Sequence, residues 1–169
     1  MIKRQYNWKR DRLDSRDHIY KLAPLQITPS AIDYRSYCSP IDDQGALGSC
    51  TGNAIAGAID LMDRKNANKQ LRVSRLFIYY NERVLEGTVN YDSGAYIRDG
   101  IKVCYTNGAC LESLWPYDIT KYRNQPNSAA VTDAAKRKVT LYQRIADHNG
   151  CLDSLASGYP VVIGFTVYS

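Results

Sequence analysis

A cysteine that follows a glycine-containing loop is the feature of this sequence that points most directly to chemistry. Residues 40–51 place Gly45 and Gly48 shortly before Cys50, and the small residues that follow predict a helix from about Ser49. Main-chain N–H groups at a helix start have no partners within the helix and carry the positive end of its dipole. Both effects favour a thiolate over a thiol. A thiolate in this position is suited to attack a carbonyl carbon.

The same helix start provides hydrogen-bond donors for an oxyanion. Main-chain N–H groups near Cys50 can donate to the oxygen of a carbonyl that the sulfur attacks. Gln44 lies six residues before Cys50 and can bring its side-chain amide beside the sulfur as a second donor. The alternative is that Cys50 is an inert core residue, because free cysteines are among the most buried residue types. The combination of an amide, flexible small residues and a helix start favours catalysis.

The other cysteines and the histidines do not form a metal-binding pattern. Five cysteines are an odd number, none are spaced as CxxC, and His18 and His148 lie far from them in the sequence. We therefore expect no metal and no cofactor. Cys104 is predicted to be a core residue. Cys38 and Cys110 fall in predicted loops and can pair in an oxidising compartment, although the sequence does not fix their connectivity.

Composition and charge indicate a globular protein. The 169 residues are 44% hydrophobic and 23% charged, which excludes a disordered chain. The sequence has no run of 18 apolar residues and no apolar stretch behind its basic start, so we expect neither a membrane span nor a secretory signal. A cytoplasmic or virion-associated location is favoured over secretion. The net charge of +5 comes without a nucleic-acid-binding motif, so no nucleic-acid or membrane partner is expected.

The chain divides into an N-terminal extension and one folded domain. Residues 1–30 are charged and lack sustained periodicity, so we expect them to pack across the surface as a pro-segment-like strap or to remain partly mobile. Residues 31–169 read as a domain in which helices come first and strands later, which indicates an α+β fold.

Hydrophobic periodicity predicts the elements of that domain. Ser74 is a good N-cap, and the helix after it is predicted to place Phe77, Tyr80 and Val84 on its inner face. Helices are predicted at about 49–64, from about 74 to just before Gly87, and at about 93–105 and 151–157, and strands are predicted at 139–145 and 161–168.

Five segments in a fixed order carry a family resemblance. They are residues 31–35, 44–50, 92–95, 115–117 and 158–162. They are similar to the mature start, the active-site segment, the substrate-binding loop, the Tyr-Pro-Tyr segment and the Gly-Pro-Val strand of papain-like cysteine peptidases, the family of papain and the cathepsins. Cys-Thr in place of Cys-Trp at the nucleophile makes the chain resemble bacterial and viral members most.

The resemblance implies a papain-like fold, with a helical lobe around a central helix that starts at Cys50 and a β-rich lobe beside it. It also implies a cysteine endopeptidase that cleaves peptide or protein substrates through an acyl-enzyme. At the matching positions, Cys50 is the nucleophile and Gln44 an oxyanion-hole donor. Gly94 is the residue whose backbone pairs with an extended substrate, and Ser49 and Gly164 are further substrate-binding residues.

The family's histidine and asparagine have no counterparts in this sequence. They follow the nucleophile by roughly 130–150 residues, whereas 119 residues (169 minus 50) follow Cys50. His148 precedes the strand predicted at 161–168, whereas the family's histidine follows it. Three explanations stay open: a fragment of an enzyme whose other part is a separate chain, an inactive papain-fold protein with a structural or binding role, or a base from another subunit.

Two departures from the family bear on how the domain is completed. Leu47 stands where the family has a half-cystine just before the nucleophile, so that disulfide is absent. The apolar strand predicted at 161–168 is covered by later strands in the family, and an uncovered strand of this kind recruits partners or aggregates. We expect a companion chain, a second copy or the N-terminal extension to cover it. The companion chain is favoured because it would also supply the missing histidine and asparagine.

Overall fold

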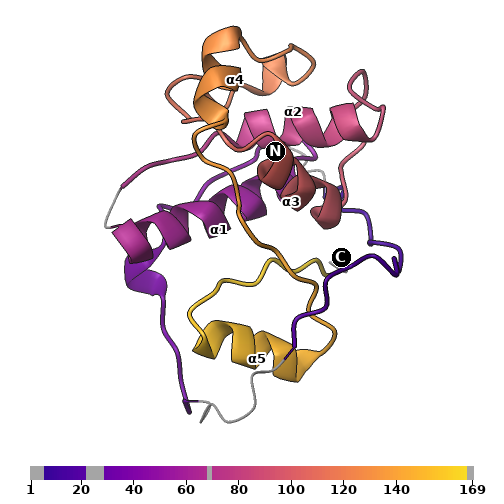
Figure 1. Ribbon diagram of the computed structural model, residues 1–169. Coiled ribbons are helices and arrows are strands. Elements are labelled where there is room, and N and C mark those ends of the chain that lie inside the picture. The colour runs from indigo at the N-terminus through magenta and orange to yellow at the C-terminus, as the bar shows by residue number, and fades with distance from the viewer. Residues whose placement is uncertain (1–5, 22–28, 68–69, 167–169) are drawn as a thin grey trace.

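The computed structural model describes residues 6–21, 29–67 and 70–166. Along these residues the helical segments are η1 (Arg35–Tyr37), α1 (Cys50–Ala67), α2 (Arg75–Leu85), α3 (Ile97–Thr106), η2 (Ile119–Lys121), α4 (Ser128–Ala134) and α5 (His148–Ala156). Helices α1, α2 and α3 pack together, with α4 beside α2 at one end of the molecule and α5 at the other (Figure 1). Among the described helices, none is both long and apolar enough to cross a membrane.

Helix α1 forms the centre of the helical layer, as the sequence predicted. Its residue Ile55 joins a core cluster with Ile78 of α2 and Cys104 of α3. Gly52 allows α2 to approach closely, since a Cβ at this position would lie 2.8 Å from the main-chain oxygen of Arg75. The predicted burial of Cys104 is confirmed, because its side chain is fully buried.

Helix α2 begins where the sequence predicted, after Ser74. The hydroxyl of Ser74 accepts the main-chain N–H of Phe77 at 3.1 Å and donates to the main-chain oxygen of Trp115 at 2.6 Å. The cap therefore satisfies a free N–H of the first turn and also ties the helix to a distant loop.

The predicted inner face of α2 is only partly correct. Phe77 is buried, but Val84 is 49% exposed and Tyr80 is half-buried. The buried positions near the end of the helix are instead Glu82 and Arg83. The hydrophobic pattern did not predict the burial of Glu82 and Arg83, because both are charged residue types. In the structure, Glu82 accepts a hydrogen bond from Thr51, and Arg83 donates hydrogen bonds to main-chain carbonyl oxygens, which offsets the cost of burying them.

The remaining helices agree with the prediction to different degrees. Helices α3 and α5 lie close to their predicted ranges. Helix α4 was not predicted, because seven residues are too few to establish a periodic pattern. Its start carries a local signal nonetheless, since the side chain of Asn127 accepts the main-chain N–H of Ala130 at 2.8 Å.

The two predicted strands are wrong for the residues that the structure describes. Residues 139–145 and 161–166 belong to no strand, and residues 167 and 168 lie outside the described range. The described residues contain only isolated bridges, namely Lys9 with Tyr96, Ile19 with Arg144 and Val73 with Leu111. A strand needs a neighbouring strand to form its ladder of hydrogen bonds. The described chain provides too little pairing for these apolar segments to form one.

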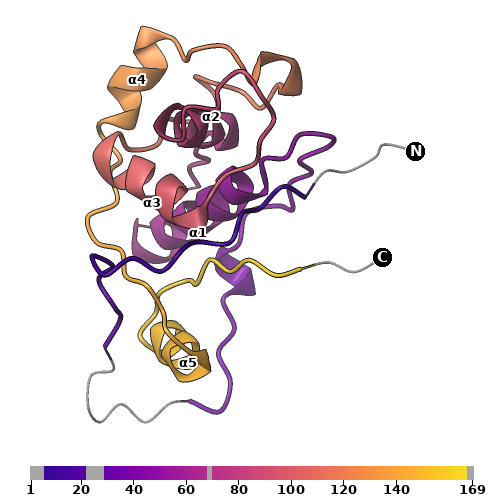
Figure 2. The same cartoon turned by 90° about the vertical axis from the view of Figure 1, so that its right-hand side faces the viewer.

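The N-terminal segment of residues 6–21, which we name the strap, lies between the helical layer and the C-terminal segment (Figure 2). Arg144 pairs with it through two main-chain hydrogen bonds, from its N–H to His18 at 2.7 Å and from Tyr20 to its oxygen at 2.8 Å. The side chain of Asp17 contacts Arg98 at 2.7 Å and Arg144 at 2.9 Å.

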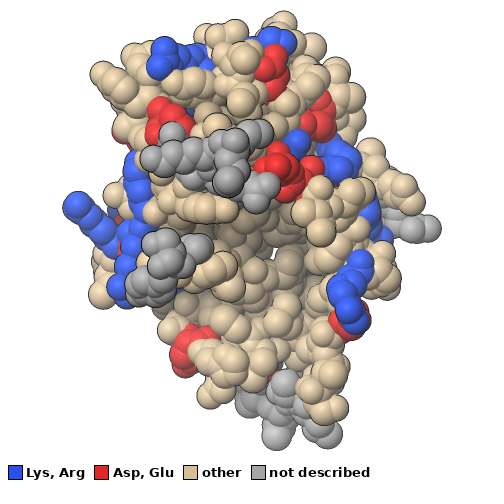
Figure 3. Space-filling model, turned by 180° about the vertical axis from the view of Figure 1, so that it is seen from behind, with Lys and Arg blue, Asp and Glu red and all other residues tan. Residues whose placement is uncertain are grey.

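Viewed from behind, the molecule is hollowed at its centre, and most of the side chains around the hollow are uncharged (Figure 3).

Candidate active site

Cys50 is the first residue of α1, and its side chain is half-buried. Burial raises the pKa of its thiol above the ordinary value, and the carboxylate of Glu82 adds to this effect. Main-chain N–H groups of Thr51, Trp8 and Cys50 itself hydrogen-bond the sulfur and lower the pKa, but by less. The lowered pKa expected from the helix start is therefore wrong for this arrangement. Desolvation of the sulfur outweighs its hydrogen-bond donors.

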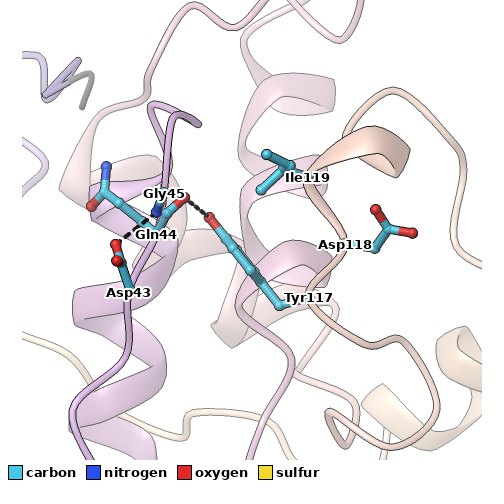
Figure 4. Close-up of a pocket in the computed structure, with 6 residues that line it drawn as sticks. All are labelled: Asp43, Gln44, Gly45, Tyr117, Asp118 and Ile119. Atoms are coloured by element: carbon cyan, nitrogen blue, oxygen red, sulfur yellow. Dashed lines mark hydrogen bonds between the residues drawn. The ribbon is translucent and has the colours of Figure 1, made fainter. Parts of the chain in front are cut away.

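Gln44 stabilises the loop before Cys50 through hydrogen bonds of its side chain and its main chain. Its side-chain amide donates to the main-chain oxygen of Leu47 at 2.9 Å, and its own main-chain oxygen accepts the hydroxyl of Tyr117 at 3.0 Å. In Figure 4 the Gln44 amide points away from Tyr117. An open cavity of about 450 Å³ lies beside this loop, lined by Asp43, Gln44, Gly45, Tyr117, Asp118 and Ile119. The loop is therefore compact, and the role of Gln44 as an oxyanion donor stays a prediction.

Ser49 supports this loop from the inside. Its side chain is fully buried, its hydroxyl lies 2.5 Å from that of Tyr117, and Asn53 donates to it at 3.0 Å. The guanidinium of Arg75 lies 4.0 Å from the centre of the Tyr117 ring and holds the ring in place. The side chain of Ser49 is thus engaged within the fold, and the role of this residue in substrate binding stays a prediction.

The strap lies directly on the predicted substrate loop. Gly94 has a φ of +66°, and a Cβ on it would lie 1.7 Å from the main-chain oxygen of Asn7. The main-chain pairing itself falls one residue later, where the N–H of Lys9 donates to the oxygen of Ala95 at 3.1 Å. The N–H of Gly94 instead donates to the hydroxyl of Tyr79 at 3.1 Å. The residue that pairs with the strap in this structure is therefore the buried Ala95, and the role of Gly94 in binding a substrate stays a prediction.

Trp8 connects the nucleophile to the C-terminal segment. Its main-chain N–H hydrogen-bonds Cys50, and its indole packs so closely on Gly164 that a Cβ there would lie 2.1 Å from Trp8 Cε2. Cys50, Gly94 and Gly164 are thus gathered around residues 7–9 of the strap. The sequence analysis missed Trp8, although a tryptophan within a charged extension was a signal that it packs on something.

The other groups considered as chemical candidates lie apart from this site. His18 and His148 are exposed, and no hydrogen bond joins either to Cys50 within the described residues. All five cysteines lie in the described part and are free, with Cys38 exposed and Cys110 buried, so those two do not pair. No group of three or more His, Cys, Asp or Glu side chains gathers for a metal ion among the described residues.

The fold, with Cys50 as the first residue of α1, resembles that of papain-like cysteine peptidases. A search against family models found no match. A peptidase C1-like protein of Acanthamoeba polyphaga mimivirus is 41% identical over 162 residues, which cover 90% of this chain and 50% of that protein. Xylellain, a cysteine protease from Xylella fastidiosa, is 38% identical with a TM-score of 0.79, over 90% of this chain and 63% of xylellain.

A more distant structure has the same fold. Procathepsin L 3 from the larval midgut of Tenebrio molitor is 14% identical, with a TM-score of 0.65 over 85% of this chain and 46% of that chain. These similarities support the assignment of this chain to the papain-like cysteine peptidases, with similar proteins in a bacterium and a virus. The predicted helical lobe with an incomplete β-rich lobe is confirmed. The chain spans about half the length of the curated relative.

Proposed function

We propose that this chain carries the nucleophile, the oxyanion loop and the substrate loop of a cysteine endopeptidase. The observation that supports this most is the placement of residues 7–9, an extended peptide, across Cys50, Gly94 and Gly164 at once. A peptide substrate needs the same three contacts: the scissile carbonyl at the sulfur, its main chain on the substrate loop, and a side chain against the C-terminal segment.

In the proposed reaction, the Cys50 thiolate attacks the peptide carbonyl carbon and forms a carbon–sulfur bond. The main-chain N–H of Cys50 and the amide of Gln44 stabilise the oxyanion. The C–N bond then breaks, the amine leaves with a proton from a histidine, and water hydrolyses the thioester. That histidine and its orienting asparagine come from outside these 169 residues.

The strap is proposed to act as a pro-segment-like cover of this site. Trp8 donates its main-chain N–H to Cys50, and Asn7 lies on Gly94, so a substrate cannot occupy these positions while the strap is in place. Lys9 helps to hold it through an ion pair with Glu86 at 2.6 Å. Displacement of the strap therefore precedes binding of a substrate.

The C-terminal segment is proposed to bind a companion polypeptide that completes the β-rich lobe. Ile163 is 64% exposed and Phe165 is 71% exposed, although both belong to the apolar run at 161–166. Trp8 packs on Gly164 between them. Burying an exposed isoleucine or phenylalanine contributes about 1.5–3 kcal/mol, so a partner that covers them gains substantial binding free energy. A second copy of this chain is the alternative occupant.

The competing proposal is an inactive papain-fold protein with a structural or peptide-binding role. The raised pKa of the Cys50 thiol favours it, because a neutral thiol is a weak nucleophile. The two proposals differ in whether a peptide brought to the site is attacked by the sulfur.

A peptidyl fluoromethylketone tests the catalytic proposal, because attack by a thiolate displaces fluoride and leaves a stable thioether. The full chain and its Trp8→Ala variant are treated, and mass spectrometry locates the adduct. We expect labelling of Cys50 that is faster in Trp8→Ala and absent in Cys50→Ser. Exposed Cys38 serves as the internal control for unassisted reactivity. Labelling of Cys50 no faster than that of Cys38 in Trp8→Ala would reject the catalytic proposal in favour of the inactive protein.

A further inference from the structure

The loop that carries Cys50 is held to the rest of the molecule by a carboxylate. Both oxygens of Asp92 accept the main-chain N–H of Gly48, at 3.1 Å to Oδ1 and 2.9 Å to Oδ2. Gly48 lies two residues before Cys50, whereas Asp92 lies two residues before Gly94. One side chain therefore joins the nucleophile loop, residues 44–49, to the substrate loop, residues 92–95.

Tyr79 of α2 extends this connection. Its hydroxyl donates to Asp92 Oδ1 at 2.5 Å, and its oxygen accepts the main-chain N–H of Gly94 at 3.1 Å. Burial and the hydrogen bond to Asp92 raise the pKa of Tyr79, so the phenol keeps its proton and remains a donor. The guanidinium of Arg83 lies 4.2 Å from the centre of the Tyr79 ring and fixes the ring from one side. The connection is thus continuous from Gly48 to Gly94.

Apolar packing follows the same path. Leu47, in the nucleophile loop, belongs to one buried cluster with Tyr79 and with Ala95 of the substrate loop. Leu47 also stands at the position of the half-cystine that papain-like peptidases have just before the nucleophile. In this chain, packing and the Asp92 carboxylate hold the loop that carries Cys50.

We propose that Asp92 and Tyr79 form a clamp that sets the position of the nucleophile loop relative to the substrate loop. The inference rests on the proposed function, since the clamp matters for chemistry only when a peptide lies on both loops. Neither side chain contacts the reacting atoms, so both are positioning residues. A misplacement of about 1 Å between a nucleophile and a bound substrate can cost on the order of a hundredfold in rate.

The test separates the reactivity of Cys50 from its alignment with a peptide. In the full chain carrying Trp8→Ala, Cys50 is alkylated with iodoacetamide, which needs no substrate loop, and with a peptidyl fluoromethylketone, which does. Asp92→Asn and Tyr79→Phe should each lower the peptidyl rate about tenfold, as expected for loss of a hydrogen bond to a charged group. The iodoacetamide rate should stay within about twofold. Tyr80→Phe, the matched control on the next residue of α2, should change neither rate.

A double variant tests whether the two residues act as one unit. Because each single change breaks the same connection, Asp92→Asn with Tyr79→Phe should lose no more than the larger single loss. Additive losses, or single variants that keep the ratio of the two rates, would overturn the clamp.

Hydrogen exchange keeps the clamp testable if the catalytic proposal fails. If the peptidyl reagent labels Cys50 no faster than Cys38 in the Trp8→Ala chain, the proposed function is rejected, and exchange at the amides of Gly48 and Gly94 then decides the clamp. Faster exchange at both amides in Asp92→Asn, without the same change in Tyr80→Phe, supports it. Unchanged exchange at both refutes it.

Discussion

Gly94 illustrates how one backbone position determines both a loop and what lies on it. Its φ of +66° is unfavourable for residues with a Cβ, and such a Cβ would meet the main chain of Asn7. We predict that Gly94→Ala lowers the free energy of unfolding by about 1–2 kcal/mol and displaces the strap. Chemical denaturation and the iodoacetamide rate of Cys50 measure the two effects. Gly57→Ala, in open space on α1, is the control and should leave both unchanged or slightly increase stability.

Glu82 makes stability depend on pH. Burial raises the pKa of this carboxyl to about 8, whereas the hydrogen bond from Thr51 lowers it. A group whose folded pKa is raised contributes its stability below its unfolded pKa and loses it as pH rises through the folded value. We predict that melting temperature falls between pH 5 and pH 8 in the parent chain and falls less in Glu82→Gln. Thermal unfolding at both pH values measures this, and identical slopes for the two proteins would argue against a buried ionisation at this site.

At the scale of elements, the N-cap of α2 connects local sequence to long-range structure. Ser74 is buried, and its hydroxyl bonds both Phe77 and Trp115. We predict that Ser74→Ala destabilises the protein by about 1–2 kcal/mol, because one helix N–H and one distant carbonyl lose their partner. Urea unfolding monitored by circular dichroism measures this loss. Ser74→Thr keeps the hydroxyl and should recover part of it, and a stable Ser74→Ala protein would contradict the role of the cap.

Helices whose signals are local were predictable, and features that depend on distant contacts were not. Residue types at neighbouring positions indicate both the start of α1 at Cys50 and the N-cap of α2 at Ser74. The apolar segment at 161–166 has the composition of a β-strand, but no neighbouring strand pairs with it among the described residues. Composition alone therefore predicted a strand that the structure does not form there. In the site, the resemblance proposes roles for Cys50, Gly94 and Gly164, which lie together around the strap, and these roles stay predictions. Asp92 was not, because its role depends on contact with a residue 44 positions away.

At the scale of the whole molecule, charged contacts hold the strap in place. Asp17 bridges Arg98, at the start of α3, and Arg144, in the segment before α5. Burial alone would raise the pKa of Asp17, but hydrogen bonds from these two arginines bring it below its ordinary value. A carboxyl with a lowered folded pKa contributes stability at neutral pH and loses it as pH falls through that folded value.

We therefore predict that Asp17→Asn loosens the strap at pH 7 while the helical layer stays folded. Limited proteolysis should cut within residues 6–21 faster in this variant, and iodoacetamide should reach Cys50 faster. In the parent chain the same loosening should appear only in acid, below the ordinary pKa of an aspartate. Asp14→Asn, which breaks a local pair with Arg16 on the surface, is the control and should leave proteolysis unchanged.

The central claim, that Cys50 is a nucleophile directed at peptide carbonyls, is tested most directly by acylation with an activated ester. An N-acylphenylalanine p-nitrophenyl ester offers an aromatic side chain for the position beside Gly164 that Trp8 occupies. Attack by Cys50 releases p-nitrophenolate and leaves a thioester, and without the family histidine the acyl group should remain on the sulfur. The account predicts, for Trp8→Ala, a burst of about one equivalent with the acyl group on Cys50. No burst, or an equal burst in Cys50→Ala, would contradict it.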